Sequence, residues 1–275
     1  MPFSLACLVC VNIMFNLIFT AMTLYRTLLT FLSFLLTIST SFVYSKDKIV
    51  KHVYTDTQGK VMPYCLILPD NYNAKKQYPL IIFLHGGGER GVDNQSQLKY
   101  VSELFMEKQF RKDIPCLILL PQCPDGEYWV NVDRINWKFP EKTMANEQLC
   151  SVVELTGKLV KDKKVDPDQI SAVGMSMGGM AVLSLVRDYP DLLKSAISIC
   201  GATNIEALKQ ADVKTRVWLI HGDSDPVVPA YFSRKAYAVL KDKNDNCRYT
   251  EYQKTMHDSW NKAFQEPDFL YWLFE

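Results

Sequence analysis

The chain has 275 residues, of which 48% are hydrophobic and 22% are charged. This length and composition suit one globular α/β domain with a sizeable core and argue against a disordered chain. The 31 basic and 30 acidic side chains nearly cancel, so no excess of positive charge is available to attract nucleic acid.

The first 45 residues differ from the rest because Arg26 is their only charged residue. Arg26, the apolar stretch 28–38 and the small residues that end at Ser45 together resemble a secretory signal with a cleavage site. The competing interpretation is a membrane anchor, because the apolar stretch 5–24 is long enough to span a bilayer.

We therefore expect two parts, a signal peptide or membrane anchor at residues 1–45 and an α/β domain at residues 46–275. The expected localisation is periplasmic or secreted, or membrane-anchored if the segment is retained. A membrane is a partner only in the second case.

Eight cysteines are present, and six of them follow residue 45. These six are Cys65, Cys116, Cys123, Cys150, Cys200 and Cys247. An even number in an exported protein permits disulfides, although their pairing cannot be read from the sequence. The spacing matches no zinc motif, and Cys65, Cys116 and Cys200 lie in apolar runs where buried thiols are expected. Neither a metal nor an organic cofactor is predicted.

Thirteen segments carry the hydrophobic pattern of a strand or a helix. In chain order they are strands at 48–57, 61–68 and 79–84, a helix at 95–110, a strand at 115–120, a helix at 143–161, a strand at 169–173, a helix at 180–186, strands at 195–200 and 216–220, a helix at 231–240, a strand at 247–252 and a helix at 267–274. The first two strands predict a hairpin, and strands then alternate with helices. This order predicts a mostly parallel, doubly wound eight-stranded sheet with helices on both faces, whose ligand site lies at the carboxyl ends of the strands.

The central motif is Gly174-Met175-Ser176-Met177-Gly178, which lies between the expected strand at 169–173 and the helix at 180–186. A G-x-S-x-G in this context is typical of the nucleophile elbow of α/β-hydrolases, a sharp turn that exposes the serine. Ser176 is therefore the candidate nucleophile. The following helix N-terminus would direct free N–H groups toward a carbonyl oxygen that gains charge.

A serine nucleophile needs a base, and the base needs an acid that orients it. In α/β-hydrolases the chain order is Ser, then Asp or Glu, then His. Of the four histidines, only His257 follows the last strand, whereas His85 and His221 each end a strand before a glycine and are expected to brace loops. Two aspartates, Asp223 and Asp225, follow the strand at 216–220, and their positions alone favour neither as the acid.

An oxyanion hole needs two backbone N–H groups. The N–H of Met177 follows the nucleophile directly and is the first candidate. The second comes from the loop after the strand at 79–84, where Gly87 is preferred and Gly88 is the alternative.

Five motifs in this order are similar to those of a known family. They are His85-Gly86-Gly87-Gly88-Glu89-Arg90-Gly91, Pro121-Gln122-Cys123-Pro124, Gly174-Met175-Ser176-Met177-Gly178-Gly179, His221-Gly222-x-x-Asp225-x-x-Val228-Pro229 and His257-x-x-Trp260. Over about residues 50 to 275 the chain resembles the bacterial exported esterase or "predicted peptidase" branch of the α/β-hydrolases. It is similar to dienelactone hydrolases, phospholipase/carboxylesterases and polyhydroxybutyrate depolymerase-like esterases. The resemblance implies that Asp225 is the acid, and it supports Gly87.

The expected function is hydrolysis of carboxylic esters through an acyl-enzyme, on small or carbohydrate-linked substrates. Residues 201–215 are too few to hold an inserted lid domain, so the site should be open. Trp129 and Trp137 could stack on a sugar or phenolic ring, or could instead pack their loop onto the domain. A serine peptidase acting on short peptides is the alternative function. A non-enzymatic binding module would predict an incomplete set of catalytic residues.

Overall fold

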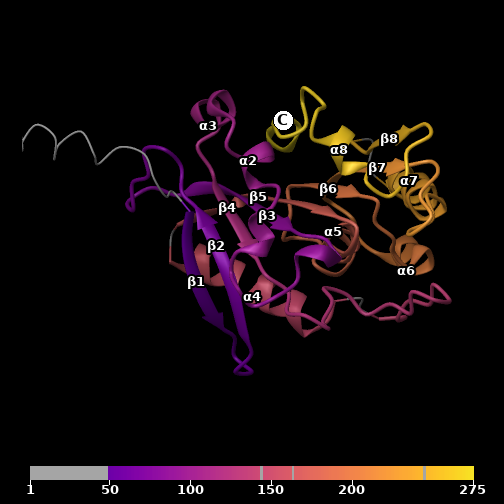
Figure 1. The fold of residues 1–275 in the computed structure, drawn as a ribbon, viewed down its shortest axis with the longest axis horizontal. Coiled ribbons are helices and arrows are strands. Elements are labelled where there is room, and N and C mark those ends of the chain that lie inside the picture. Colours follow the sequence, from indigo (N-terminus) through magenta and orange to yellow (C-terminus); the bar gives the residue numbers. More distant parts are fainter. Residues whose placement is uncertain (1–48, 143–144, 163, 244–245) are drawn as a thin grey trace, which may run out of the picture. The chain divides into compact units, whose positions relative to one another are not determined.

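The computed structural model describes residues 49–142, 145–162, 164–243 and 246–275 (Figure 1). The signal peptide or membrane anchor expected at residues 1–45 lies outside the described residues. Within them, no helix is both long enough and apolar enough to cross a bilayer.

The described strands form one eight-stranded sheet. They are β1 (Ile49–Thr55), β2 (Val61–Ile67), β3 (Tyr78–Leu84), β4 (Leu117–Pro121), β5 (Val165–Met175), β6 (Ser195–Ile199), β7 (Arg216–Gly222) and β8 (Arg248–Tyr252). Their order is β1-β2-β4-β3-β5-β6-β7-β8. Strands β1 and β2 form the expected hairpin, β2 pairs antiparallel with β4, and all other pairs are parallel. The predicted α/β-hydrolase architecture is confirmed.

The helices cover both faces of the sheet (Figure 1). The α-helices are α2 (Val101–Leu104), α3 (Lys108–Asp113), α4 (Glu147–Lys161), α5 (Met177–Asp188), α6 (Ile205–Gln210), α7 (Tyr231–Lys243) and α8 (Trp260–Ala263), and the 3-10 turns are η1 (Gly87–Glu89), η2 (Ser96–Leu98) and η3 (Tyr271–Phe274). Helices α4 to α7 pack their apolar side chains on one face, in a core that includes Leu155, Leu183 and Leu240. Helices α2, α3 and α8 and the C-terminal segment cover the other face around Phe105 and Trp218.

Two of the expected helices differ from the structure. The expected helix at 95–110 is divided into η2, α2 and the first residues of α3, because two acidic side chains start separate turns. The Asp93 carboxylate accepts the N–H groups of Gln95 and Ser96, and Glu107 caps the first turn of α3. The segment at 267–274 forms a helix only in the 3-10 turn η3, with a hydrogen bond from Leu273 N–H to the Leu270 carbonyl.

The six cysteines after residue 45 are all free thiols in the structure. Cys65, Cys116 and Cys200 are buried, as expected from their apolar runs, and so is Cys123. Burial raises the pKa of the Cys116 thiol to about 12, so this thiol is protonated and unreactive at neutral pH.

Candidate active site

The turn between β5 and α5 holds Ser176 in an uncommon backbone conformation, with φ 54° and ψ −116°. A positive φ in a non-glycine residue costs free energy and persists only where the surrounding packing enforces it. Ser176 directly precedes α5, whose first N–H groups have no partner within the helix. The side chain therefore projects from the carboxyl end of the central strand, beside a helix N-terminus.

Three glycines allow the backbones around this turn to approach one another. A Cβ placed on Gly174 would lie 2.3 Å from the Gly178 carbonyl oxygen, and one on Gly179 would lie 2.4 Å from the Ile199 carbonyl oxygen. A Cβ on Gly178 would lie only 1.8 Å from the Leu84 carbonyl oxygen. These glycines are thus required for α5 to pack against the ends of β3 and β6.

We expect Gly178→Ala to destabilise the fold by roughly 3 kcal/mol or more, because the new methyl group would overlap backbone that cannot move freely. The measurement is the free energy of unfolding in urea. Gly157→Ala in the middle of α4 is the matched control, since nothing lies within 4 Å of its added Cβ. The control should be neutral or more stable by up to about 1 kcal/mol. Equal stabilities for the two variants would contradict this account of the turn.

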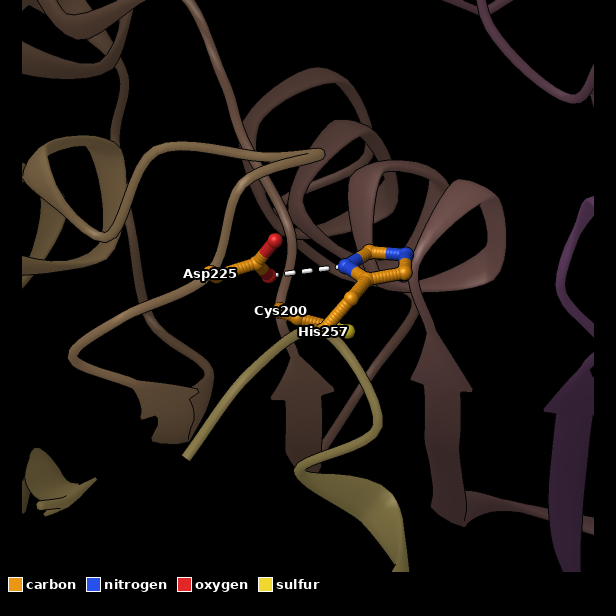
Figure 2. A group of neighbouring side chains, drawn as sticks. All are labelled: Cys200, Asp225 and His257. Carbon is orange, nitrogen blue, oxygen red and sulfur yellow. Dashed lines mark hydrogen bonds and ion pairs between the residues drawn. The ribbon is translucent and has the colours of Figure 1, made fainter. Parts of the chain in front are cut away.

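Ser176, His257 and Asp225 form a continuous chain of hydrogen bonds. The Ser176 hydroxyl lies 2.8 Å from His257 Nε2. On the other side of the ring, His257 Nδ1 lies 2.7 Å from an Asp225 carboxylate oxygen, and Figure 2 shows this second contact. These distances fit a neutral imidazole that donates from Nδ1 to the carboxylate and accepts the serine proton at Nε2. The loops after β5, β7 and β8 bring together three side chains that are far apart in the sequence.

The Asp225 carboxylate is fully buried and accepts several hydrogen bonds. One of its oxygens accepts the N–H groups of Val227 and Val228, and the other also lies 3.2 Å from His221 Nε2. Burial alone would raise the pKa of Asp225, but the hydrogen bonds from His221, His257 and the two N–H groups outweigh it and hold the pKa well below its usual range. Because its pKa is lower in the folded than in the unfolded protein, the ionised Asp225 carboxylate contributes to folding stability. This contribution is complete above the unfolded pKa of about 3.9 and is lost as the pH falls through the folded pKa.

The alternative acid, Asp223, has a different role. Its carboxylate accepts hydrogen bonds from the Ser224 hydroxyl and the Thr255 N–H, at 2.7 and 3.4 Å. It therefore connects the loop after β7 to the loop that carries His257. The structure brings Asp225 to the histidine and leaves Asp223 as a loop-capping residue.

The two buried histidines brace loops, as expected. His85 Nδ1 contacts the Gly86 carbonyl oxygen at 2.7 Å, and its Nε2 accepts the Cys123 N–H at 3.0 Å. Burial lowers the pKa of His85 to about 4, so the ring stays neutral at physiological pH. His221 Nδ1 lies 2.7 Å from the Ser233 hydroxyl, while its Nε2 lies 2.9 Å from the Val228 carbonyl oxygen and 3.2 Å from Asp225. This contact with Asp225 was not expected from the sequence, although the i, i+4 spacing of the two residues permits it.

Cys200, at the end of β6, is a further neighbour that the sequence did not assign to the site. Its backbone also has a positive φ, 42°, and its thiol, the Asp225 carboxylate and the His257 ring lie close together (Figure 2). The donor atoms of these three residues lie within 4.8 Å of one another, and zinc uses all three donor types. Two of the three already share the 2.7 Å hydrogen bond, so a metal ion here would displace the proton between His257 and Asp225.

Of the predicted oxyanion donors, Met177 directly follows the nucleophile, and Gly87 and Gly88 come directly after Gly86 in the loop after β3. Met177 is the first residue of α5, and the loop after β3 passes so near that a Cβ on Gly86 would lie 3.8 Å from Ser176 Cβ. Gly87 and Gly88 both have open space where a side chain would be. Arg90 Nε donates to the Gly87 carbonyl oxygen at 2.8 Å, which fixes the peptide that joins the two glycines.

The two tryptophans predicted to bind substrate lie in different environments. Trp129 is fully buried, and its indole N–H donates to the His85 carbonyl oxygen at 3.2 Å. The substrate-binding prediction for Trp129 is wrong, because a ring with no exposed face serves to pack its loop. Trp137 is half-buried and packs against Phe232, with ring centroids 5.0 Å apart.

The comparison with protein families places most of the chain in one family. The phospholipase/carboxylesterase family model matches residues 71–271. The chain belongs to this family of α/β-hydrolases. The match spans the segment from the loop before β3 to η3 and therefore includes Ser176, Asp225 and His257.

Individual relatives of this phospholipase/carboxylesterase family member include esterases and peptidases. A crystal structure of a thermostable esterase superposes with a TM-score of 0.75 and 31% identity, over 83% of this chain and 63% of that one. Acyl-protein thioesterase 1 of Saccharomyces cerevisiae is 25% identical over 189 residues, which are 63% of this chain and 80% of the relative. Dipeptidyl-peptidase 5 of Porphyromonas gingivalis is 26% identical over 167 residues, which are 61% of this chain but only 23% of the peptidase. The chain thus spans about a quarter of that peptidase and less than two thirds of the thermostable esterase.

Proposed function

We propose that this protein is a serine hydrolase that cleaves carboxylic esters through an acyl-enzyme intermediate. The observation that carries the proposal is the chain of hydrogen bonds from Asp225 through His257 to Ser176, at 2.7 and 2.8 Å. In this proposal Ser176 is the nucleophile, His257 the general base and Asp225 the acid that orients the imidazole.

The first half of the reaction forms the acyl-enzyme. Ser176 Oγ attacks the ester carbonyl carbon as His257 Nε2 takes its proton, and Asp225 stabilises the resulting imidazolium. The N–H groups of Met177 and Gly87, with Gly88 as the alternative to Gly87, stabilise the negative oxygen of the tetrahedral intermediate. The intermediate collapses when the C–O bond to the alcohol breaks and His257 gives its proton to the leaving oxygen.

The second half hydrolyses the acyl-enzyme and releases the carboxylic acid product, with water in place of the alcohol and the same catalytic residues. Water gives a proton to His257 Nε2 and attacks the acyl carbon. The bond to Ser176 Oγ then breaks, and the proton returns to the serine. The net reaction consumes one water and needs neither a metal nor an organic cofactor.

The proposed substrates are small or carbohydrate-linked acyl esters. Residues 200–215, between β6 and β7, contain only the short helix α6, which supports a site without an inserted lid domain. Trp137 is retained as a proposed contact for a ring of the substrate. The names of the relatives, a thermostable esterase and an acyl-protein thioesterase, agree with ester or thioester cleavage.

In the same proposal residues 1–45 are a signal peptide or membrane anchor, and the intact mass of the exported protein distinguishes the two.

A peptidase is the second candidate function, favoured by the similarity to dipeptidyl-peptidase 5. The experiment compares p-nitrophenyl acetate with a dipeptide p-nitroanilide under identical conditions. We expect the ester to turn over at least a hundred times faster in kcat/KM, whereas faster cleavage of the anilide would favour the peptidase. The absence of turnover for both would contradict the proposed hydrolase.

A further inference from the structure

A cavity lies beside the loop that supplies one of the proposed oxyanion donors. It has a volume of about 330 Å³, and its wall consists of Gly88, Glu89, Gln95, Ser96, Leu98 and Lys99. This volume is in the range of small-ligand sites. None of these residues except Gly88 has a role in the proposed chemistry.

Glu89 is the unusual member of this wall. Only 5% of its surface is exposed, yet its carboxylate has one polar side-chain contact among the described residues, with Lys99 Nζ at 3.5 Å. An ionised carboxylate can accept about four hydrogen bonds. Glu89 therefore has unused acceptor capacity beside the cavity.

The Glu89 carboxylate lies close to the nucleophile. A Cβ built on Gly86 would be 3.2 Å from Glu89 Oε2 and 3.8 Å from Ser176 Cβ. The separation between Glu89 Oε2 and Ser176 Cβ is thus at most the sum of these two distances. A group attached to an ester carbonyl at Ser176 can reach this carboxylate.

A row of side chains connects the cavity to the catalytic histidine on another side. Lys99 lies over the Tyr100 ring at 5.1 Å, and the Tyr100 and Trp260 centroids are 6.4 Å apart. Trp260 in turn contacts the His257 ring with centroids 5.5 Å apart. Lys99, at the wall of the cavity, is thus linked to the His257 ring through the two intervening rings of Tyr100 and Trp260.

We propose that Glu89 and Lys99 form a subsite that binds a neutral polyhydroxyl group of the substrate, such as the sugar of an acylated carbohydrate. The carboxylate accepts hydroxyl protons, and the ammonium donates to hydroxyl oxygens. Glu89 and Lys99 carry opposite charges, so Lys99 would repel a cationic substrate group and Glu89 an anionic one. A neutral hydroxyl can donate a hydrogen bond to Glu89 and accept one from Lys99. This inference rests on the proposed ester hydrolase and names the part of the substrate that the cavity recognises.

The test compares 6-O-acetylglucose with cyclohexylmethyl acetate, which carry the same acyl group on rings that differ in their hydroxyls. A site that hydrogen-bonds a substrate hydroxyl discriminates strongly against an analogue without it. We expect wild-type kcat/KM to favour the glucose ester. Glu89→Gln should reduce this preference by about tenfold or more, as loss of a hydrogen bond to a charged group predicts. Lys99→Met should reduce it in the same direction.

The control is Glu206→Gln, which alters an exposed carboxylate on α6 that pairs with Lys209 and should leave the preference unchanged. Thermal unfolding of each variant checks that it is folded, and Lys99→Met provides the test if Glu89→Gln does not fold. An unchanged preference in folded Glu89→Gln or Lys99→Met would overturn the subsite, as would a wild-type enzyme with no preference for glucose. Turnover of both esters by Ser176→Ala would instead overturn the proposed hydrolase, so the two failures are distinguishable.

Discussion

Ser176→Ala is expected to reduce kcat for p-nitrophenyl acetate by about 10⁴-fold to 10⁶-fold, because no other group can form the acyl-enzyme. Alanine has the same Cβ and can adopt the same backbone conformation, so the elbow should persist. The measurement is the initial rate at saturating substrate, with circular dichroism and thermal unfolding to verify the fold.

The matched control for this substitution is Ser224→Ala. The Ser224 hydroxyl donates to Asp223 at 2.7 Å, and its removal should leave kcat within about twofold of the unmodified protein. A folded Ser176→Ala variant that retains more than a few per cent of the turnover would show that another residue is the nucleophile.

Asp225→Asn should lower kcat by about 10⁴-fold. The amide of asparagine carries no charge to stabilise the imidazolium, and its NH₂ group favours the wrong histidine tautomer. The hydrogen bonds from Val227 and Val228 end on one carboxylate oxygen, so they orient the amide oxygen toward these N–H groups and its NH₂ toward His257. The rate should be measured from pH 6 to 9, because a tautomer defect persists across this range.

Asp223→Asn is the comparison that the chain itself offers, two residues away in the same loop. It removes a charge near His257 but not the hydrogen bond to the imidazole, so kcat should fall by less than about tenfold. Equal losses for Asp223→Asn and Asp225→Asn would mean that the loop as a whole, and not the Asp225 carboxylate, determines the rate.

Much of the fold and of the candidate site could be predicted from the sequence, because the strongest patterns are local. The apolar strand before Ser176 and the small residues after it require a sharp turn, and only His257 follows the last strand. The choice between Asp223 and Asp225 needed more than position, since both follow β7. The choice depends on the conformation of the loop after β7. In the structure the N–H groups of Val227 and Val228 donate to the Asp225 carboxylate and fix the orientation of that side chain.

Other features depend on contacts between segments that are far apart in the sequence. The sequence pattern indicates that Trp129 is an exposed aromatic residue of a loop. The structure shows that it is fully buried and donates a hydrogen bond to the His85 carbonyl oxygen. The helix expected at 95–110 has suitable apolar spacing, but the caps at Asp93 and Glu107 divide it. The neighbourhood of Glu89 could not be predicted either, because its burial and its contact with Lys99 depend on how the loop after β3 folds.

The most direct test of the central claim, that Ser176 is the activated nucleophile, is covalent trapping with diethyl p-nitrophenyl phosphate followed by mass spectrometry of the peptides. We predict one diethylphosphoryl group per chain, located on Ser176, with loss of ester turnover in proportion to labelling and no labelling of Ser176→Ala. Full inactivation with the label on a different residue, or continued turnover by chains labelled at Ser176, would contradict the account.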